Sequence, residues 1–389
     1  MKGWKEVRIG DLFEIKAGGD LQEANYSPCR TDHARWAIYA NSLENKGLYG
    51  YTSQPRFRGN AITITGRGEV GHAEFRDDDF DAIVRLLVLL PKVDVDCRYI
   101  TYYINSLVHF PKESTGVPQL TAPKVKRIKI NLPQLKKEQT AIANILTKVD
   151  EAIASVQNSI TAAERLKKSL MQNLLTGKMK PDGTFRTSEE FYIDDKFGKV
   201  PVGWHWGRLS EIADIIAGQS PQGEYYNVNG MGKPMLNGPT EFTDKYPVPV
   251  QWTTKITKLC KKGDILFTVR GSSTGRMNLA DQEYCIGRGL AAIRPKSNNN
   301  ISFIYYTLLK ISEMILAEAK GAGTTFPNVS RGELMKKVIL IPDTHQNEII
   351  APIEQLASFS NSKQRSIDKL EILKKSLMQN LLTGRIKIL

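Results

Sequence analysis

Two short segments that combine glycine with arginine are candidates for contact with an anionic partner. The segments Gly66–Gly71 and Arg270–Arg276 each follow a run of apolar residues that is typical of a strand. Glycine allows a backbone to approach a phosphate closely, and arginine can contact phosphate or pair with guanine through two hydrogen bonds. An ordinary hairpin with a surface arginine would produce the same pattern. The candidate contacts to DNA in these segments are Arg67, Gly68, Arg270, Gly271 and Arg276.

Two carboxamide side chains follow proline at corresponding places in the chain. Gln119 and Asn328 flank predicted strands, and a carboxamide can bond both N6 and N7 of adenine. Ordinary turn chemistry is the alternative, since turns favour such residues. Further candidate contacts are basic: Arg56 and Arg58, which enclose a phenylalanine, and Lys258 in the basic segment 255–262.

The sequence lacks the common catalytic motifs. It contains no GxxxxGK[ST] phosphate loop, no HExxH, no GxSxG and no Asn/Asp-Pro-Pro-aromatic tetrapeptide. The five histidines are isolated and have no ligand spacing, which favours structural or surface roles. The acidic run Asp77–Asp81 could hold Mg²⁺, but the second half of the chain has no equivalent, which favours a solvated loop. We therefore expect no catalytic or metal site in this chain.

Composition places the chain among ordinary globular proteins. It has 389 residues, of which 41% are hydrophobic and 24% charged, and this length allows two or three domains. No run approaches the roughly 18 apolar residues that a membrane span needs. The four cysteines are scattered without a CxxC pair. We expect a cytoplasmic protein with reduced thiols and no membrane partner.

The positive charge is unevenly distributed. The formal net charge is +13, and residues 121–180 and 331–389 together carry +12 of it. An excess of this size favours an anionic partner, although charge alone says nothing about fold. The other segments, 1–120 and 181–330, have a net charge near zero. They can still bind DNA, because phosphate contact depends on charges that line one face.

The chain consists of two repeats. The twelve letters LKKSLMQNLLTG occur at residues 166–177 and again at 373–384, an offset of 207. Gly-Trp openings recur at Trp4 and Trp204, and Gln139 recurs as Gln346. Each repeat therefore has a divergent globular part followed by a nearly duplicated part of fixed length. We predict five segments: residues 1–133, 134–177, 178–202 as a linker, 203–342 and 343–389.

The duplicated parts read as long helices with a heptad stripe of apolar residues. A helix of about 38 residues is roughly 57 Å long, too long for one small domain to cover. Two separate amphipathic helices are possible, but pairing in an antiparallel coiled coil would cover both stripes. The stripe residues expected to pair or dock partners are Ile142, Leu146, Val149, Ile153, Ile160, Leu170 and Leu174, followed by Ile353, Leu356, Ile367, Leu370, Leu377 and Leu381.

Three other features refine this helix prediction. Gly177 is expected to end the first helix in the left-handed conformation. Pro352 should shift or kink the start of the second. Lys167 and Lys374 occupy equivalent stripe positions, where they could extend to solvent or meet acidic residues of another subunit.

Both globular parts read as α+β modules. In the first, we predict a helix at Arg98–Leu107 and strands at Ala61–Thr65, Ile83–Leu90 and Val125–Leu132. In the second, we predict a helix at Ser302–Lys320 and strands at Asp264–Val269, Leu290–Ile293 and Lys337–Ile341. The predicted fold is thus α+β, with two globular domains separated by two long helices in a pseudo-two-fold repeat.

Taken together, these features resemble the specificity (S) subunits of type I restriction-modification systems. The likeness covers essentially the whole chain. It rests on the Gly-Trp openings, on Asn131–Pro133 followed by Glu138-Gln139, and on the duplicated helix that ends in Leu-Leu-Thr-Gly. The second closing segment departs from the first, with His345-Gln346 and a loop two residues shorter.

The resemblance implies a non-catalytic subunit that reads double-stranded DNA. Each globular domain would be a target-recognition domain for one half of an asymmetric bipartite site, with a gap on the order of one helical turn. The coiled coil would dock two modification (methyltransferase) subunits that carry S-adenosylmethionine, and restriction subunits would add ATP- and Mg-dependent translocation and cleavage. The alternatives are a repeat-built protein-interaction scaffold and, less favoured, a single-chain restriction enzyme.

Overall fold

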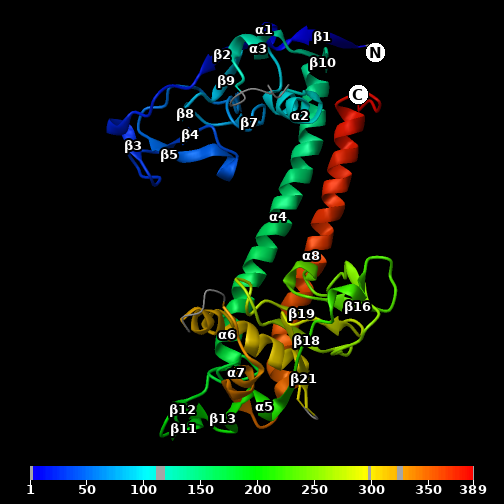
Figure 1. The fold of residues 1–389 in the computed structure, drawn as a ribbon. Coiled ribbons are helices and arrows are strands. Elements are labelled where there is room, and N and C mark those ends of the chain that lie inside the picture. Colours follow the sequence, from blue (N-terminus) through cyan, green and yellow to red (C-terminus); the bar gives the residue numbers. More distant parts are fainter. Residues whose placement is uncertain (1–2, 111–118, 297–298, 322–326, 389) are drawn as a thin grey trace. The chain divides into compact units, whose positions relative to one another are not determined.

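The structure is a computed structural model that describes residues 3–110, 119–296, 299–321 and 327–388 (Figure 1). The chain falls into two compact units, one of residues 1–158 with 363–389 and the other of residues 159–362. The boundary lies inside both long helices. Each unit therefore combines one globular module with part of each helix, and the predicted segments 134–177 and 343–389 are both shared between units.

Among its described residues, the first module contains three sheets and three α-helices. A two-stranded antiparallel sheet joins its beginning to its end, and two four-stranded sheets have the orders β2-β9-β6-β7 and β3-β5-β4-β8. Within the second of these, β4 and β8 are parallel. The elements are β1 (Trp4–Arg8), α1 (Ile9–Leu12), β2 (Phe13–Ala17), β3 (Tyr26–Ser27), β4 (Trp36–Tyr39), β5 (Leu48–Thr52), β6 (Ala61–Ile64), β7 (Ala73–Arg76), β8 (Phe80–Ala82), β9 (Leu87–Pro91), α2 (Cys97–Leu107), α3 (Ala122–Arg127) and β10 (Lys129–Pro133).

The second module repeats this topology. Its sheets have the orders β13-β22, β14-β21-β18-β19 and β15-β17-β16-β20, and β16 and β20 are the parallel pair. The α+β fold and the internal repeat are thereby confirmed. The elements are β13 (Trp204–Arg208), α5 (Leu209–Ile212), β14 (Ala213–Ala217), β15 (Tyr226–Asn227), β16 (Lys233–Leu236), β17 (Gln251–Thr253), β18 (Ile265–Thr268), β19 (Met277–Leu279), β20 (Cys285–Ile286), β21 (Leu290–Pro295), α6 (Ile301–Gly321), α7 (Arg331–Lys336) and β22 (Val338–Pro342).

Two predicted strands of the first module begin later than expected. The strand predicted at Ile83–Leu90 begins only at Leu87, because Val84 and Arg85 adopt left-handed backbone angles with φ of 51° and 60°. The strand predicted at Val125–Leu132 is preceded by helix α3, whose first turn contains a proline that suits a helix start. Both differences arise from turns that apolar periodicity does not reveal.

The segment 178–202, predicted as a linker, is folded onto the second module. It contains the antiparallel hairpin of β11 (Phe191–Asp194) and β12 (Gly198–Pro201). Val200 is fully buried in the core of the unit, and the hydroxyl of Tyr192 donates to the carbonyl of Trp204 at 2.8 Å. Two of its charged residues, Lys180 and Glu190, pair with each other at 2.7 Å.

The two long helices are α4 (Lys136–Leu174) and α8 (Gln346–Leu381). In the first unit, Ile142 and Leu146 share a core with Leu381. In the second, Leu174 shares a core with Ile353. Farther along α4 in the first unit, Asp150 pairs with Lys374 of α8, so residue numbers rise along one helix as they fall along the other and the segments run antiparallel there. All thirteen predicted stripe residues are buried or half-buried.

The identical ends of the two helices have equivalent roles. Leu174 and Leu175 enter the core of the second unit, and Leu381 and Leu382 enter the core of the first. Each helix then stops at a left-handed glycine, with φ of 62° at Gly177 and 67° at Gly384. The Gly177 prediction is confirmed, and the repeated sequence is explained because each copy fits the same kind of module.

The two stripe lysines differ from expectation, and Pro352 does not set the start of the second long helix. Helix α8 continues through Pro352, and its start is set by His345, whose φ is 66°. Lys374 pairs with Asp150 of the same unit at 2.6 Å, and Lys167 pairs with Glu164 at 2.5 Å. These lysines therefore have acidic partners within the chain.

Candidate nucleic-acid interface

In the first module, the predicted arginine and carboxamide lie on adjacent segments. Arg67 and Gln119 form an isolated antiparallel bridge, and the Leu120 N–H donates to the Gly66 carbonyl at 2.8 Å. Both Arg67 and Gln119 are exposed. Backbone hydrogen bonds thus bring together two residues that are far apart in sequence, while both side chains remain available to a ligand.

The side chain of Asn41, which sequence reasoning missed, fixes the backbone at Arg67. Its Oδ1 accepts from the N–H groups of Gly66 (2.6 Å) and Arg67 (3.2 Å). Its Nδ2 donates to the Arg67 carbonyl at 2.6 Å. Asn41 therefore uses both ends of its amide to hold one loop, which preorganises the Arg67 side chain for contact.

The loop that carries Asn41 is itself held from the core. The buried Arg76 donates from Nη2 to the Lys46 carbonyl at 2.7 Å and from Nε to Thr63 Oγ1 at 2.9 Å. Its guanidinium also lies 3.5 Å from the ring centre of Tyr39. Burial lowers the pKa of Arg76, although the group stays charged because arginine titrates so high. These contacts fix Lys46, which has a left-handed φ of 53°.

The second module brings its predicted pair together in the same way. Arg270 and Asn328 form an isolated antiparallel bridge. The Gly271 N–H donates to the Pro327 carbonyl and the Val329 N–H to the Val269 carbonyl, both at 2.9 Å. Both bridge residues are exposed. An arginine and a carboxamide are therefore paired in each module.

The second loop is braced differently from the first. The Thr274 hydroxyl donates to the Gly271 carbonyl at 2.8 Å, and its N–H donates to the same oxygen at 3.1 Å. Gly271 and Gly68 both have left-handed φ, 85° and 74°, which explains the glycine in each predicted loop. The modules thus share a pairing but differ in the residues that support it.

The other predicted basic contacts divide into two groups. Arg56 binds the buried carboxylate of Asp81 at 2.6 Å and two backbone carbonyls, so its guanidinium is held by its own module. Arg276 donates to the Phe242 carbonyl at 3.2 Å and is partly committed to its module. Arg58 and Lys258 are exposed and remain candidate contacts.

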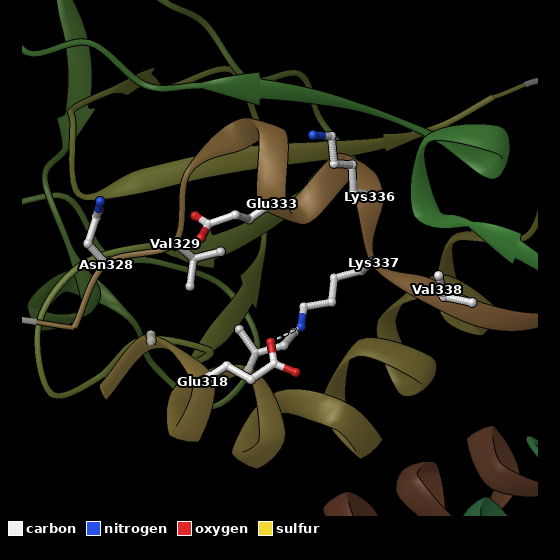
Figure 2. A pocket seen from close by; sticks show the side chains of 9 residues that line it. Glu318, Asn328, Val329, Glu333, Lys336, Lys337 and Val338 are labelled. Carbon is white, nitrogen blue, oxygen red and sulfur yellow. Dashed lines mark hydrogen bonds and ion pairs between the residues drawn. The ribbon is translucent and has the colours of Figure 1, made fainter. Parts of the chain in front are cut away.

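A cavity of about 300 Å³ lies beside Asn328 in the second unit (Figure 2). Figure 2 shows Lys337 reaching Glu318 across it, with Asn328 at the far side from this ion pair. Glu333 accepts from Ser330, whose hydroxyl and N–H hold the pKa of Glu333 below its usual value. Glu318, Glu333 and Lys337 are therefore each bound by a neighbour, and Lys336 is an exposed cation at the rim of the cavity.

Two buried thiols and part of the acidic run have surroundings that explain them without catalysis. Burial raises the pKa of Cys97 and of Cys260 to about 12 in each case, so both thiols stay protonated near neutral pH. Within the described ranges, no group of three or more His, Cys, Asp or Glu could hold a metal ion. In the acidic run, Asp81 pairs with Arg56 and Asp79 accepts from the Gly59 N–H at 2.8 Å. No helix of the described residues is long and apolar enough to cross a membrane.

Comparison with known proteins gives the family. The family model described as the type I restriction modification DNA specificity domain matches residues 1–165 and 201–371. The chain therefore belongs to this family of specificity subunits, whose members are a non-catalytic class.

Individual relatives agree over most of the chain. The putative type I restriction enzyme MjaX specificity subunit of Methanocaldococcus jannaschii is 31% identical over 316 residues, which covers 78% of this chain and 72% of the relative. The MjaVIII specificity subunit of the same organism is 25% identical over 428 residues, with 99% and 93% covered. The crystal structure of a type I restriction-modification S subunit from M. genitalium has a TM-score of 0.68 at 17% identity, covers 97% and 96%, and shows the shared fold.

Proposed function

We propose that each module reads one half of an asymmetric, bipartite site in double-stranded DNA. The observation that carries this proposal is the exposed arginine–carboxamide pair in each module, Arg67 with Gln119 and Arg270 with Asn328. Arginine can bond guanine O6 and N7 together, and a carboxamide can bond adenine N6 and N7. Glutamine and asparagine differ in reach and the two loops are braced differently, which supports two unlike half-sites.

The long helices would set the distance between the half-sites and dock the modification subunits. Their length is fixed by the repeat, whereas the modules diverge around it. Residues 121–180 and 331–389, which contain them, carry most of the net positive charge. Two modification subunits would supply S-adenosylmethionine chemistry, and restriction subunits would supply ATP- and Mg-dependent steps. The chain itself would need none of these cofactors. These assignments extend the family's role to this chain's partners.

Paired substitutions test the assignment of one half-site to each module. Arg67→Ala should weaken or relax recognition of the first module's half-site, and Arg270→Ala should do so for the other. Loss of one bidentate contact lowers discrimination by about 1–3 kcal/mol. The measurement is the methylated motif produced by the chain together with its modification subunits. Equal loss at both half-sites from either single variant would contradict the proposal and indicate damage to fold or assembly.

A further inference from the structure

Each module contains a second exposed arginine beside the first, in the connection between equivalent strands. Arg85 lies between β8 and β9, and Arg288 lies between β20 and β21. Arg85 follows Arg67 by 18 residues, and Arg288 follows Arg270 by the same interval. The two arginines therefore lie in the same connection of the internal repeat, although strand pairing aligns Arg85 with Gly289 and Arg288 with Val84.

Backbone contacts place each of these connections against the loop that carries the first arginine of its module, Arg67 or Arg270. In the first module, the Arg85 carbonyl oxygen lies 2.6 Å from the point that a Cβ on Gly66 would occupy. Glycine at this position is therefore what allows the two segments to approach. In the second module, the Val269 N–H donates to the Gly289 carbonyl at 2.9 Å, which joins the residues next to Arg270 and Arg288.

The described arginines differ in what their guanidinium groups contact. Seven donate side-chain hydrogen bonds to protein acceptors, namely Arg56, Arg76, Arg98, Arg186, Arg276, Arg294 and Arg331. In the part of the chain that the structure describes, the guanidinium groups of Arg67, Arg85, Arg270 and Arg288 have no such acceptor. Two of these uncommitted groups thus lie in adjoining segments of each module, beside an exposed carboxamide.

The backbone at Arg85 is strained in a way that function can explain. Val84 and Arg85 both have left-handed φ, and Val84 is 60% exposed. A β-branched residue in this conformation is a rare outlier, and such strain concentrates at binding sites. An exposed valine has no use at a phosphate, but it can contact the methyl group of thymine in the major groove. This favours a base edge over the DNA backbone as the ligand of this loop.

We propose that Arg85 and Arg288 are base-reading residues, each acting with the loop arginine of its own module. Arg85 acts with Arg67 and Gln119, and Arg288 acts with Arg270 and Asn328. The proposal rests on the proposed DNA-reading function and adds a second reading residue to each half-site. The expected ligand is guanine, because its O6 and N7 accept the two parallel hydrogen bonds of a guanidinium.

The test uses the chain assembled with its modification subunits and duplexes in which each base pair of the site is substituted in turn. Arg85→Ala should lower discrimination at one base pair of the first module's half-site by about tenfold or more, and Arg288→Ala should do the same in the other half. Arg8→Ala and Arg208→Ala are matched controls. They remove exposed arginines at equivalent positions of β1 and β13 and should leave discrimination unchanged.

Substitution by lysine separates base reading from charge. Arg85→Lys keeps the charge but loses the planar fork, so non-specific binding should remain while discrimination stays low. Wild-type discrimination by Arg85→Ala, or its full restoration by Arg85→Lys, would overturn the inference even if Arg67→Ala relaxes its half-site as expected. If the wild-type assembly itself shows no base discrimination, the proposed function fails as well. Matching unfolding curves for the Ala and Lys variants would show that the fold is intact.

Discussion

Equivalent helices in the two modules begin with different capping residues. The carboxylate of Asp96 accepts from the N–H groups of Arg98 and Tyr99 at the start of α2. At the start of α6, the amide oxygen of Asn300 accepts from the N–H groups of Ser302 and Phe303. Both residues are good helix caps, but only the aspartate can titrate. One module therefore has an acid-sensitive cap.

The charge of Asp96 should make the first module less stable in acid. Burial opposes ionisation of Asp96, but hydrogen bonds from Arg98 and Thr140 outweigh it and hold its pKa below the usual value. Because the folded-state pKa is lower than the unfolded one, the stabilisation is complete above about pH 4 and is lost as pH falls through the folded pKa. Asp96→Asn should therefore be less stable than wild type near neutral pH, and the difference should close in acid.

Thermal unfolding from about pH 3 to 7 measures this difference. Asn300→Ala is the matched control, because removing a neutral cap should cost about 1 kcal/mol with little dependence on pH. A gap between Asp96→Asn and wild type that stays constant across this range would show that the ion pair with Arg98 does not contribute as described.

At this scale the sequence could indicate candidate residues but not their contacts. Residue type and spacing pointed to Arg67 and to Gln119 separately, and only the backbone pairing in the structure shows that the two residues are adjacent. The sequence also indicated Arg56, whose guanidinium is bound to Asp81, a partner 25 residues away. No motif or spacing in the sequence indicated that Asn41 would hold the Arg67 loop. For Arg85 and Arg288 a signal did exist, since their interval from the loop arginines is the same in both repeats.

At the scale of elements, one glutamine in each repeat ties a long helix to its module. Gln139 is 2% exposed, accepts from the Asp96 N–H at 3.1 Å and donates to the Pro133 carbonyl at 2.9 Å. Gln346 accepts from the Asn300 N–H at 2.7 Å. The repeated glutamine thus connects the start of each long helix to the capping residue of α2 in the first module and of α6 in the second.

Gln139→Ala should be more destabilising than Gln346→Ala. The first leaves a buried donor and a buried acceptor unpaired, at about 1–3 kcal/mol for each group, whereas Gln346 is only half-buried and water can replace it. Denaturant unfolding measures both. Gln139→Met fills the same space without polar atoms, so wild-type stability in that variant would show that packing, not hydrogen bonding, accounts for the effect.

Long elements could be predicted from the sequence better than short ones. The heptad stripe located both long helices because its period is sustained over many turns. The strands of two to six residues are too short to show a period, and the turn at Val84 depends on backbone angles that residue type does not favour. The hairpin at 191–201 was missed because tertiary packing, not composition, orders it.

At the scale of the molecule, the helices should act as a ruler for the gap between half-sites. Insertion of seven residues into each helix, after Asn158 and after Ser362, keeps the heptad stripe in register. Each insertion adds roughly 10 Å of helix, which corresponds to at most about three base pairs of duplex. The methylated motif should then show a wider gap and unchanged half-sites, and an unchanged gap would refute the ruler.

The central claim is that this chain selects the DNA sequence that its partner subunits modify. The most direct measurement is a genome-wide map of N6-methyladenine in the source cell, with and without the gene. We predict that deletion removes one asymmetric bipartite motif and leaves all other methylation in place, and that the gene restores the motif when returned. If the motif is present in the parent and persists in the deletion strain, another protein selects that sequence, and the central claim is contradicted.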